Sequence, residues 1–218
     1  MTWQIFERAA AGYEAWYATP RGRRADVAER RLLLHLLRAF PDARSGVEIG
    51  CGTGHFAAFL AGHGLSMIGL ERAPAMLADA HRRYPALPVV AGDAHRLPFR
   101  DRSTDLALFV TTLEFLEDPA GALREAVRVA HLGVVAMVLN RHSLGGLSRR
   151  WGPQSRGELL GEAHDYSSAE LRLALEQAAG SRLDAIRTAS TLFPDGLSQV
   201  IGRVSLGDVI GSAVRFAR

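Results

Sequence analysis

Short apolar runs alternate with amphipathic stretches along most of the chain. Five runs stand at residues 45–49 (SGVEI), 66–70 (SMIGL), 88–92 (PVVAG), 105–110 (DLALFV) and 132–139 (LGVVAMVL). Two further β-type runs, LDAIRT and SAVRFAR, follow at residues 183–188 and 212–218. Continuous apolar runs of this length are typical of strands that are buried on both faces of a sheet.

Apolar residues at helical spacing fill most of the intervals between these runs. They predict helices at residues 28–40, 55–64, 74–83, 119–130 and 168–180. Pro74 and Pro119 begin two of these segments, where the missing N–H of proline does no harm. Strands alternating with helices predict an α/β fold, a doubly wound, mostly parallel seven-stranded sheet with helices on both faces.

The N-terminal segment carries an aromatic stripe. Phe6, Tyr13 and Tyr17 stand at i, i+7 and i+11, one face of a helix, with Trp16 beside it. Such a stripe either packs on the body of the fold or covers a binding site, and both can hold together. We expect one domain over residues 1–218: a helical cap to residue 40, a core at 41–140, an irregular excursion and helix at 141–180, and strands at 181–218.

Composition excludes several kinds of chemistry. The chain has 218 residues and a formal net charge of +3, and all its basic residues other than histidine are arginine. The arginines are scattered, which disfavours a nucleic-acid surface, and the absence of lysine excludes a Schiff base. Cys51 is the only cysteine, so no intrachain disulfide forms. Without a signal-peptide pattern or a membrane-length apolar run, we expect a soluble, cytoplasmic protein.

The stretch VEIGCGTG at residues 47–54 is the clearest motif. Gly50, Gly52 and Gly54 follow the first strand directly and precede a predicted helix. Glycines at such a turn let the backbone approach a ligand closely. The spacing is G-x-G-x-G, and His55 stands where the dinucleotide fingerprint has its last glycine, which disfavours NAD. No G-K-[ST] follows, so the segment is not a phosphate-binding P-loop.

Acidic residues end the neighbouring strands. Glu71 closes the second strand roughly 20 residues after the glycines, the spacing at which a carboxylate meets ribose hydroxyls. Asp93 follows the third strand, and Glu48 stands just before Gly50. Because the carboxyl ends of parallel strands share one edge of the sheet, these acids are expected around one pocket. Such a pocket repels phosphate and suits a cationic adenosine derivative.

The ordered motifs VEIGCGTG, GLERAPAML, AGDAHRLPF, STDLALFVTTLEFLEDP and VVAMVLN resemble the class I S-adenosylmethionine-dependent methyltransferases. The resemblance covers residues 40–140 and is to the small-molecule branch with the ubiquinone and menaquinone biosynthesis enzymes. It implies S-adenosylmethionine as cofactor, S-adenosylhomocysteine as product and a small-molecule acceptor. It further implies that the cofactor contacts Tyr13, Glu48, Gly50, Cys51, Gly52, Gly54, Leu70, Glu71, Met76, Asp93, Ala94 and Thr111. The family's N-P-P-[YF] signature for amide and adenine methylation is absent.

Other candidates carry weaker signals. His142 follows the fifth predicted strand and is either a general base or a surface histidine. Arg149, Arg150 and Arg156, in the excursion, either receive an anionic acceptor or are solvated. No histidine spacing fits a metal site. Two alternative functions stay open, a cofactor-sensing or partner-binding protein without turnover and an RNA or protein methyltransferase. Oligomeric state is not predicted.

Overall fold

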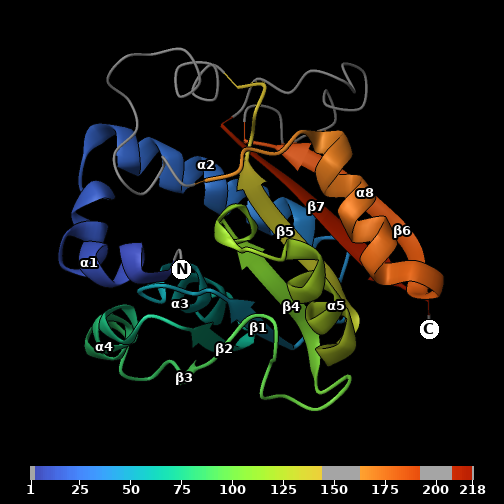
Figure 1. Cartoon of the computed structure of the whole chain (residues 1–218), viewed down its shortest axis with the longest axis horizontal. Helices are drawn as coiled ribbons and strands as arrows, with labels where there is room; N and C mark the ends of the chain where they lie inside the picture. Colours follow the sequence, from blue (N-terminus) through green and yellow to red (C-terminus); the bar gives the residue numbers. More distant parts are fainter. Residues whose placement is uncertain (1–2, 144–162, 192–207, 218) are drawn as a thin grey trace.

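The computed structural model describes residues 3–143, 163–191 and 208–217. Within them the strands form a seven-stranded sheet in the order β3-β2-β1-β4-β5-β7-β6 (Figure 1). The strands are β1 (Ser45–Ile49), β2 (Ser66–Glu71), β3 (Val89–Ala91), β4 (Thr104–Val110), β5 (Ala130–Leu139), β6 (Leu183–Ser190) and β7 (Val209–Phe216). The first five pair in parallel, whereas β7 is antiparallel to both β5 and β6. The predicted fold class is confirmed.

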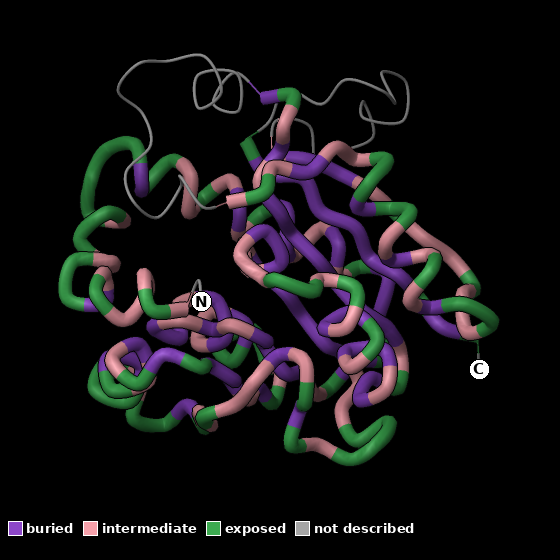
Figure 2. Tube along the Cα trace, in the orientation of Figure 1, coloured by how far each residue is buried: buried purple, intermediate pink, exposed green. Residues whose placement is uncertain are grey.

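Helices cover both faces of the sheet. The helices α2 (Pro20–Leu37) and α3 (His55–Ala61) pack on one face, and α5 (Pro119–Val129) and α8 (Ser168–Ala179) on the other. Side chains of β4 alternate between them: Leu106 and Leu108 face α2 and α3, while Ala107 and Phe109 face α5 and α8. The central strands are therefore buried on both sides, as Figure 2 shows.

Helix starts follow local sequence signals. Asp118 accepts a hydrogen bond from Gly121 N at 2.9 Å and caps α5, which begins with Pro119. Ser167 and Glu170 form a capping box at the start of α8. The helix predicted at 28–40 is longer than expected: α2 begins at Pro20, because the Thr19 hydroxyl accepts from Gly22 N at 2.9 Å.

The N-terminal segment differs from its prediction. The helix α1 (Trp3–Tyr13) ends at Tyr13, and the 3₁₀ turn η1 (Glu14–Trp16) follows, so the aromatic stripe is divided between two elements. This segment packs against α4 (Pro74–Arg83) through Ala10 on one side and Ala73 and Met76 on the other. Within the described residues, no helix combines the length and apolar character needed to cross a bilayer.

The order of strands places a crevice at the end of β1. The chain leaves β1 toward β2 on one side and later returns to β4 on the other. At such a switch point, the loops after the strands diverge and leave room for a ligand.

Candidate functional site

The glycine loop (residues 50–54) is tied to the end of β2. Gly50 N and Cys51 N both donate to Leu70 O, at 2.7 and 3.0 Å. Gly50 has a φ of 75°, and a Cβ there would lie 2.3 Å from Thr112 Cγ2. Gly52 has a φ of 54° with nothing within 4 Å of its missing Cβ. The loop therefore needs glycine at Gly50 for space and conformation, and at Gly52 it presents bare backbone to an open volume.

Glu71 fastens the same loop from the other side. Its carboxylate accepts from Gly52 N at 3.0 Å and from Arg72 N and Ala73 N at 2.8 Å each. Two carboxylate oxygens offer about four acceptor sites, so roughly one stays available to a ligand. The sequence suggested that Glu71 meets both ribose hydroxyls, whereas three backbone donors already hold it. Glu71 thus shapes the loop as well as facing the cavity.

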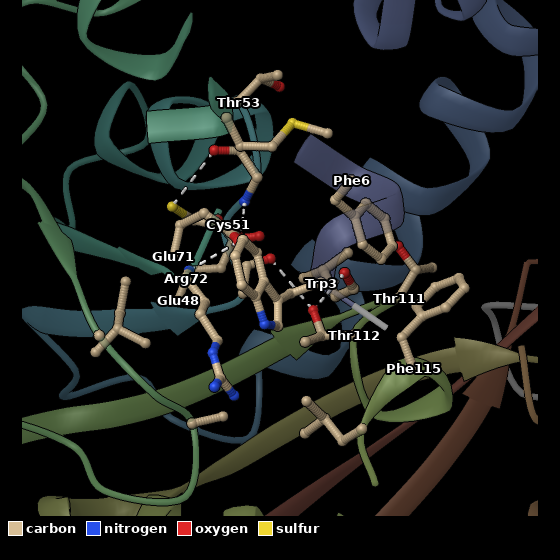
Figure 3. Close-up of a pocket in the computed structure, with 18 of the residues that line it drawn as sticks. Trp3, Phe6, Glu48, Cys51, Thr53, Glu71, Arg72, Thr111, Thr112 and Phe115 are labelled. Carbon is tan, nitrogen blue, oxygen red and sulfur yellow. Dashed lines mark hydrogen bonds between the residues drawn. The ribbon is translucent and has the colours of Figure 1, made fainter. Parts of the chain in front are cut away.

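A cavity of about 300 Å³ opens beside this loop (Figure 3). Its walls come from the ends of β1, β2, β3 and β4 and from the N-terminal segment. Of the residues expected to contact a cofactor, it is lined by Tyr13, Glu48, Gly50, Cys51, Gly52, Leu70, Glu71, Met76, Asp93, Ala94 and Thr111. Residues 40–140 and the aromatic stripe thus converge on one volume.

Gly54, an expected cofactor contact, and His142, the candidate general base, lie outside the lining. Gly54, with a φ of 81°, is the N-cap of α3, and a Cβ there would meet Leu87, Tyr84 and Ala80. Its place is therefore a packed turn behind the cavity. His142 is exposed, and its backbone N–H donates to Asn140 Oδ1 at 3.1 Å.

The arginines of the excursion cannot be placed. Arg149, Arg150 and Arg156 lie outside the described residues.

Within the described part of the chain, no cluster of three or more histidine, cysteine, aspartate or glutamate side chains is arranged to hold a metal ion.

Glu48 is a buried acid in the cavity wall. It is 2% exposed, and its Oε2 has no hydrogen-bond partner in the described part of the chain. Burial, with the nearby charge of Glu71, raises the pKa of Glu48 to about 8. The carboxyl is therefore mostly protonated at neutral pH, which corrects the expectation of a third negative charge beside the glycine loop. An orphaned buried oxygen here suits a cationic ligand group that brings its own N–H donors.

Asp93 interacts with His95 and Arg72 at the edge of the cavity. Burial favours its neutral form, but hydrogen bonds from His95 N at 2.9 Å and Nδ1 at 2.7 Å outweigh it and lower the pKa of Asp93. Its Oδ2 lies 3.0 Å from Arg72 Nη1. The carboxylate is ionised and held in position, and it still lines the cavity next to Ala94.

The residues after β4 are strained. Thr111 has a φ of 50°, which is unusual for a β-branched residue, and its N–H donates to Met137 O at 2.8 Å. The Thr112 hydroxyl donates to backbone carbonyls at the ends of two strands, Gly50 O after β1 at 3.3 Å and Val110 O in β4 at 3.2 Å. Strain of this kind costs on the order of 1–3 kcal/mol and persists where the surroundings hold it. Here it turns Thr111 into the cavity.

Cys51 fills space in the turn. It is 6% exposed, and a Cβ at Gly69 would come within 2.6 Å of its Sγ. Burial raises the pKa of the Cys51 thiol well above its usual range. A protonated, packed thiol is a poor nucleophile, so Cys51 lines the cavity as a small apolar group.

The cover (residues 3–17) closes the cavity from outside. Glu7 Oε2 accepts from Ala75 N at 2.9 Å, joining α1 to the start of α4. Phe6 meets Phe115, which follows β4, with ring centroids 4.9 Å apart at 87°. Figure 3 shows Phe6 and Trp3 reaching from the cover toward the residues at the strand ends.

A second set of contacts joins the cover to the glycine loop. Tyr17 stacks on His55 with centroids 4.1 Å apart at 8°, and Glu14 accepts from the Thr53 hydroxyl. His55 Nε2 lies 2.8 Å from Asp26 Oδ1, and Nδ1 lies 3.6 Å from Glu14 Oε2. Burial disfavours the charged ring, but the two carboxylates outweigh it and raise the pKa of His55. We call Glu14, Tyr17, Asp26 and His55 the clasp.

Sequence reasoning missed several lining residues, among them Trp3, His55, Arg72 and Phe115. His55 was noted only as the residue that breaks a dinucleotide fingerprint. Trp3 could not be identified from nearby residues, because its neighbours in space, Ala73 and Met76, are about 70 residues away along the chain. Pairing between distant segments leaves no local signal of this kind.

The sheet order, the glycine loop and the acids at the strand ends define a Rossmann-like methyltransferase fold. In comparison with known proteins, residues 47–138 match the Methyltransferase domain family. The chain is thus similar to class I S-adenosylmethionine-dependent methyltransferases of the small-molecule branch, and the resemblance seen in its motifs is confirmed.

Individual relatives agree with this family. A demethylmenaquinone methyltransferase of Beutenbergia cavernae is 36% identical over 104 residues, 48% of this chain and 43% of the relative. A malonyl-[acyl-carrier protein] O-methyltransferase of Pectobacterium atrosepticum is 31% identical over 153 residues, 68% of this chain and 56% of the relative. The chain spans about half the length of the curated relatives it matches.

A solved structure matches nearly the whole chain. It is a SAM-dependent methyltransferase of Thermotoga maritima, described as a possible histamine N-methyltransferase. It is 28% identical with a TM-score of 0.76, covering 99% of both chains.

Proposed function

We propose that this protein transfers a methyl group from S-adenosylmethionine to a small-molecule acceptor. The observation that carries the proposal is the cavity at the ends of β1, β2 and β3, walled by the glycine loop, Glu48, Glu71 and Asp93. The fit is chemical: bare backbone at Gly52, an orphaned carboxyl oxygen on Glu48 and an ionised carboxylate on Asp93 suit a cationic adenosine compound. Relatives named as methyltransferases of small acceptors support the same reading.

Each wall has a part in holding the cofactor. Glu48, Gly50 and Gly52 would hold the methionine portion, Glu71 a ribose hydroxyl, and Asp93 and Ala94 the adenine edge. Leu70 and Met76, both fully buried, provide an apolar surface beside the adenine. S-adenosylmethionine supplies an already activated methyl group on its sulfonium, so the protein's task is to orient the reactants and exclude water. Orientation of this kind contributes up to roughly 7–11 kcal/mol in favourable cases.

The described lining residues favour transfer without a dedicated strong base. His55 lines the cavity, but contacts with Glu14 and Asp26 outweigh its burial and raise its pKa. This makes the ring a weaker acceptor of a proton from the substrate only where it is already charged. Burial raises the pKa of Tyr13 and of Tyr17, so both stay neutral hydroxyls that donate hydrogen bonds. Tyr13 is thus suited to bind the methionine carboxylate. An acceptor that is nucleophilic without losing a proton fits this arrangement best.

Titration calorimetry tests the proposal. We expect binding of S-adenosylmethionine and S-adenosylhomocysteine and none of NAD. Glu71→Ala should weaken cofactor binding by roughly 1.5–3 kcal/mol, the range for hydrogen bonds to a charged group, and Glu71→Gln by less, because its amide oxygen still accepts. Glu176→Ala, on α8 across the sheet, is the matched control. Tight NAD binding with no response to S-adenosylhomocysteine would overturn the proposal.

Turnover separates an enzyme from a sensor on the same fold. The protein should form S-adenosylhomocysteine from S-adenosylmethionine with a metabolite extract and not with buffer alone. Binding without product under any fraction of the extract would favour the cofactor-sensing alternative. Product only with RNA or protein added would favour a macromolecular acceptor.

A further inference from the structure

Trp3 lies at one particular end of the cavity. It begins α1 and packs with Ala73 and Met76, at the start of α4 just after β2. Arg72 Cζ stands 5.7 Å from the centre of its ring, and Arg72 in turn pairs with Asp93 at 3.0 Å. Figure 3 shows the indole reaching into the cavity beside Arg72 and Glu71. The side chain is therefore at the ends of β2 and β3.

The indole brings two binding features to this end of the cavity. Its Nε1 is buried and has no hydrogen-bond partner in the described part of the chain. A buried N–H without an acceptor is unfavourable, so its position is best explained by an acceptor that arrives with a ligand. Its ring lines the cavity, and an indole face is a good stacking platform for a purine.

We propose that Trp3 is the cover's contact with the adenine, packing its ring on the base and donating its Nε1–H to an acceptor on the adenosine. This inference rests on the proposed function, because it takes the ligand to be an adenosine compound. Leu70, at the end of β2, adds an apolar side chain to the lining of the cavity, so we place the base between the cover and the end of this strand. Contact between Trp3 and the adenine then helps to hold the cover in place over the cavity.

The first test compares two ligands that share adenosine. S-adenosylhomocysteine and free adenosine are titrated into the wild type, Trp3→Ala, Trp3→Phe and Trp16→Ala. Trp3→Ala should weaken both ligands by the same factor, roughly tenfold, since a base–aromatic stack is worth about 1–3 kcal/mol. Trp3→Phe keeps a ring and should lose less. Trp16, 42% exposed on the same cover, is the matched control and should change affinity by about twofold at most.

The second test reads the contact directly. The chain has three tryptophans, so a Trp16→Phe, Trp151→Phe variant leaves Trp3 as the one indole fluorophore. Adenosine should change the emission of this variant, and methionine should not, because only the base meets the ring.

Each contrary result has one meaning. Adenosine binding to Trp3→Ala with wild-type or higher affinity would overturn the Trp3 proposal, because the indole would then be packing only or blocking the site. Unchanged emission of Trp3 on adenosine binding would do the same. A wild-type protein that binds neither ligand would instead overturn the proposed function, and the Trp3 proposal with it.

Discussion

Glu48 shows how much a residue's chemistry depends on its surroundings. Its place before Gly50 could be read from the sequence, and so could its position beside the cavity. Its protonation could not, because the rise of its pKa to about 8 comes from burial and from Glu71, 23 residues further along the chain. Glycine positions were predictable for the opposite reason, since a turn after a strand demands them whatever packs around it.

Cofactor binding should therefore depend on pH through Glu48. A cationic ligand group favours the ionised carboxylate, so binding should release a proton below pH 8, and affinity should rise with pH until about 8. Calorimetry in buffers of different ionisation enthalpy measures this release. Glu48→Gln should abolish the dependence.

Glu114 provides the control for this experiment. Burial raises its pKa to about 8 as well, but it does not line the cavity, and its Oε1 accepts from Leu139 N at 3.1 Å. Glu114→Gln should leave the pH dependence of binding as in the wild type. If Glu48→Gln also left it unchanged, the assignment of Glu48 to the cationic part of the ligand would be wrong.

At the scale of elements, the sequence indicated a helical segment at the N-terminus but not the break within it. A stripe at i, i+7 and i+11 indicated one helix, yet α1 ends at Tyr13 and η1 redirects the chain. Periodicity indicates which residues would share a face of one continuous helix. It does not reveal the turn that places Tyr17 against His55. The clasp depends on groups from η1, α2 and α3, which no single stretch of sequence displays together.

The clasp should open as pH rises. Contacts with Glu14 and Asp26 raise the pKa of His55, so the contribution of these contacts is complete at low pH and is lost as pH rises through that pKa. Amide exchange in residues 3–17, corrected for intrinsic rates, should accelerate over this range. His55→Ala should show fast exchange at every pH.

His63→Ala is the matched control for the clasp, because His63 is exposed and bonds only within its own segment, to Phe59 O. It should leave exchange of residues 3–17 as in the wild type. Slow, pH-independent exchange in His55→Ala would show that α1 is held by its contacts with α4 alone.

For the whole molecule, the strand and helix segments of the core were predicted closely, and strand pairing at the C-terminal end was not. The apolar runs place β1 to β5 within a few residues, because strands buried on both faces leave an unmistakable hydrophobic pattern. The same pattern does not say that β7 inserts between β5 and β6, antiparallel to both. Pairing partners are chosen by contacts such as Thr188 with Ser212, 2.8 Å apart across β6 and β7.

Stability of the folded chain should fall as pH rises from about 5 to about 8. Burial raises the pKa of Glu29, Glu48 and Glu114 to about 8 each, from an ordinary value of 4.5. The folded state therefore binds more protons than the unfolded state in this window, and each group contributes a slope of at most about 1.4 kcal/mol per pH unit. His55 adds to the trend with the same sign.

Urea unfolding across this pH range measures the slope, and Glu114→Gln should reduce it. Glu176→Gln, whose side chain pairs with Arg172 on α8, should leave it unchanged. A free energy of unfolding that stays level or increases between pH 5 and 8 would mean that these acids are solvated in the folded protein.

The backbone conformation of Thr111 matters for engineering the stability of this protein. Its left-handed backbone disfavours every side chain, and most of all a β-branched one, so glycine is the residue that this position would accept with least strain. A search for heat-resistant variants that scores melting alone therefore favours glycine at 111, which removes a side chain that lines the cavity. Under the proposed function, melting temperature and methyl transfer thus favour different residues at this position, and a useful screen has to score both.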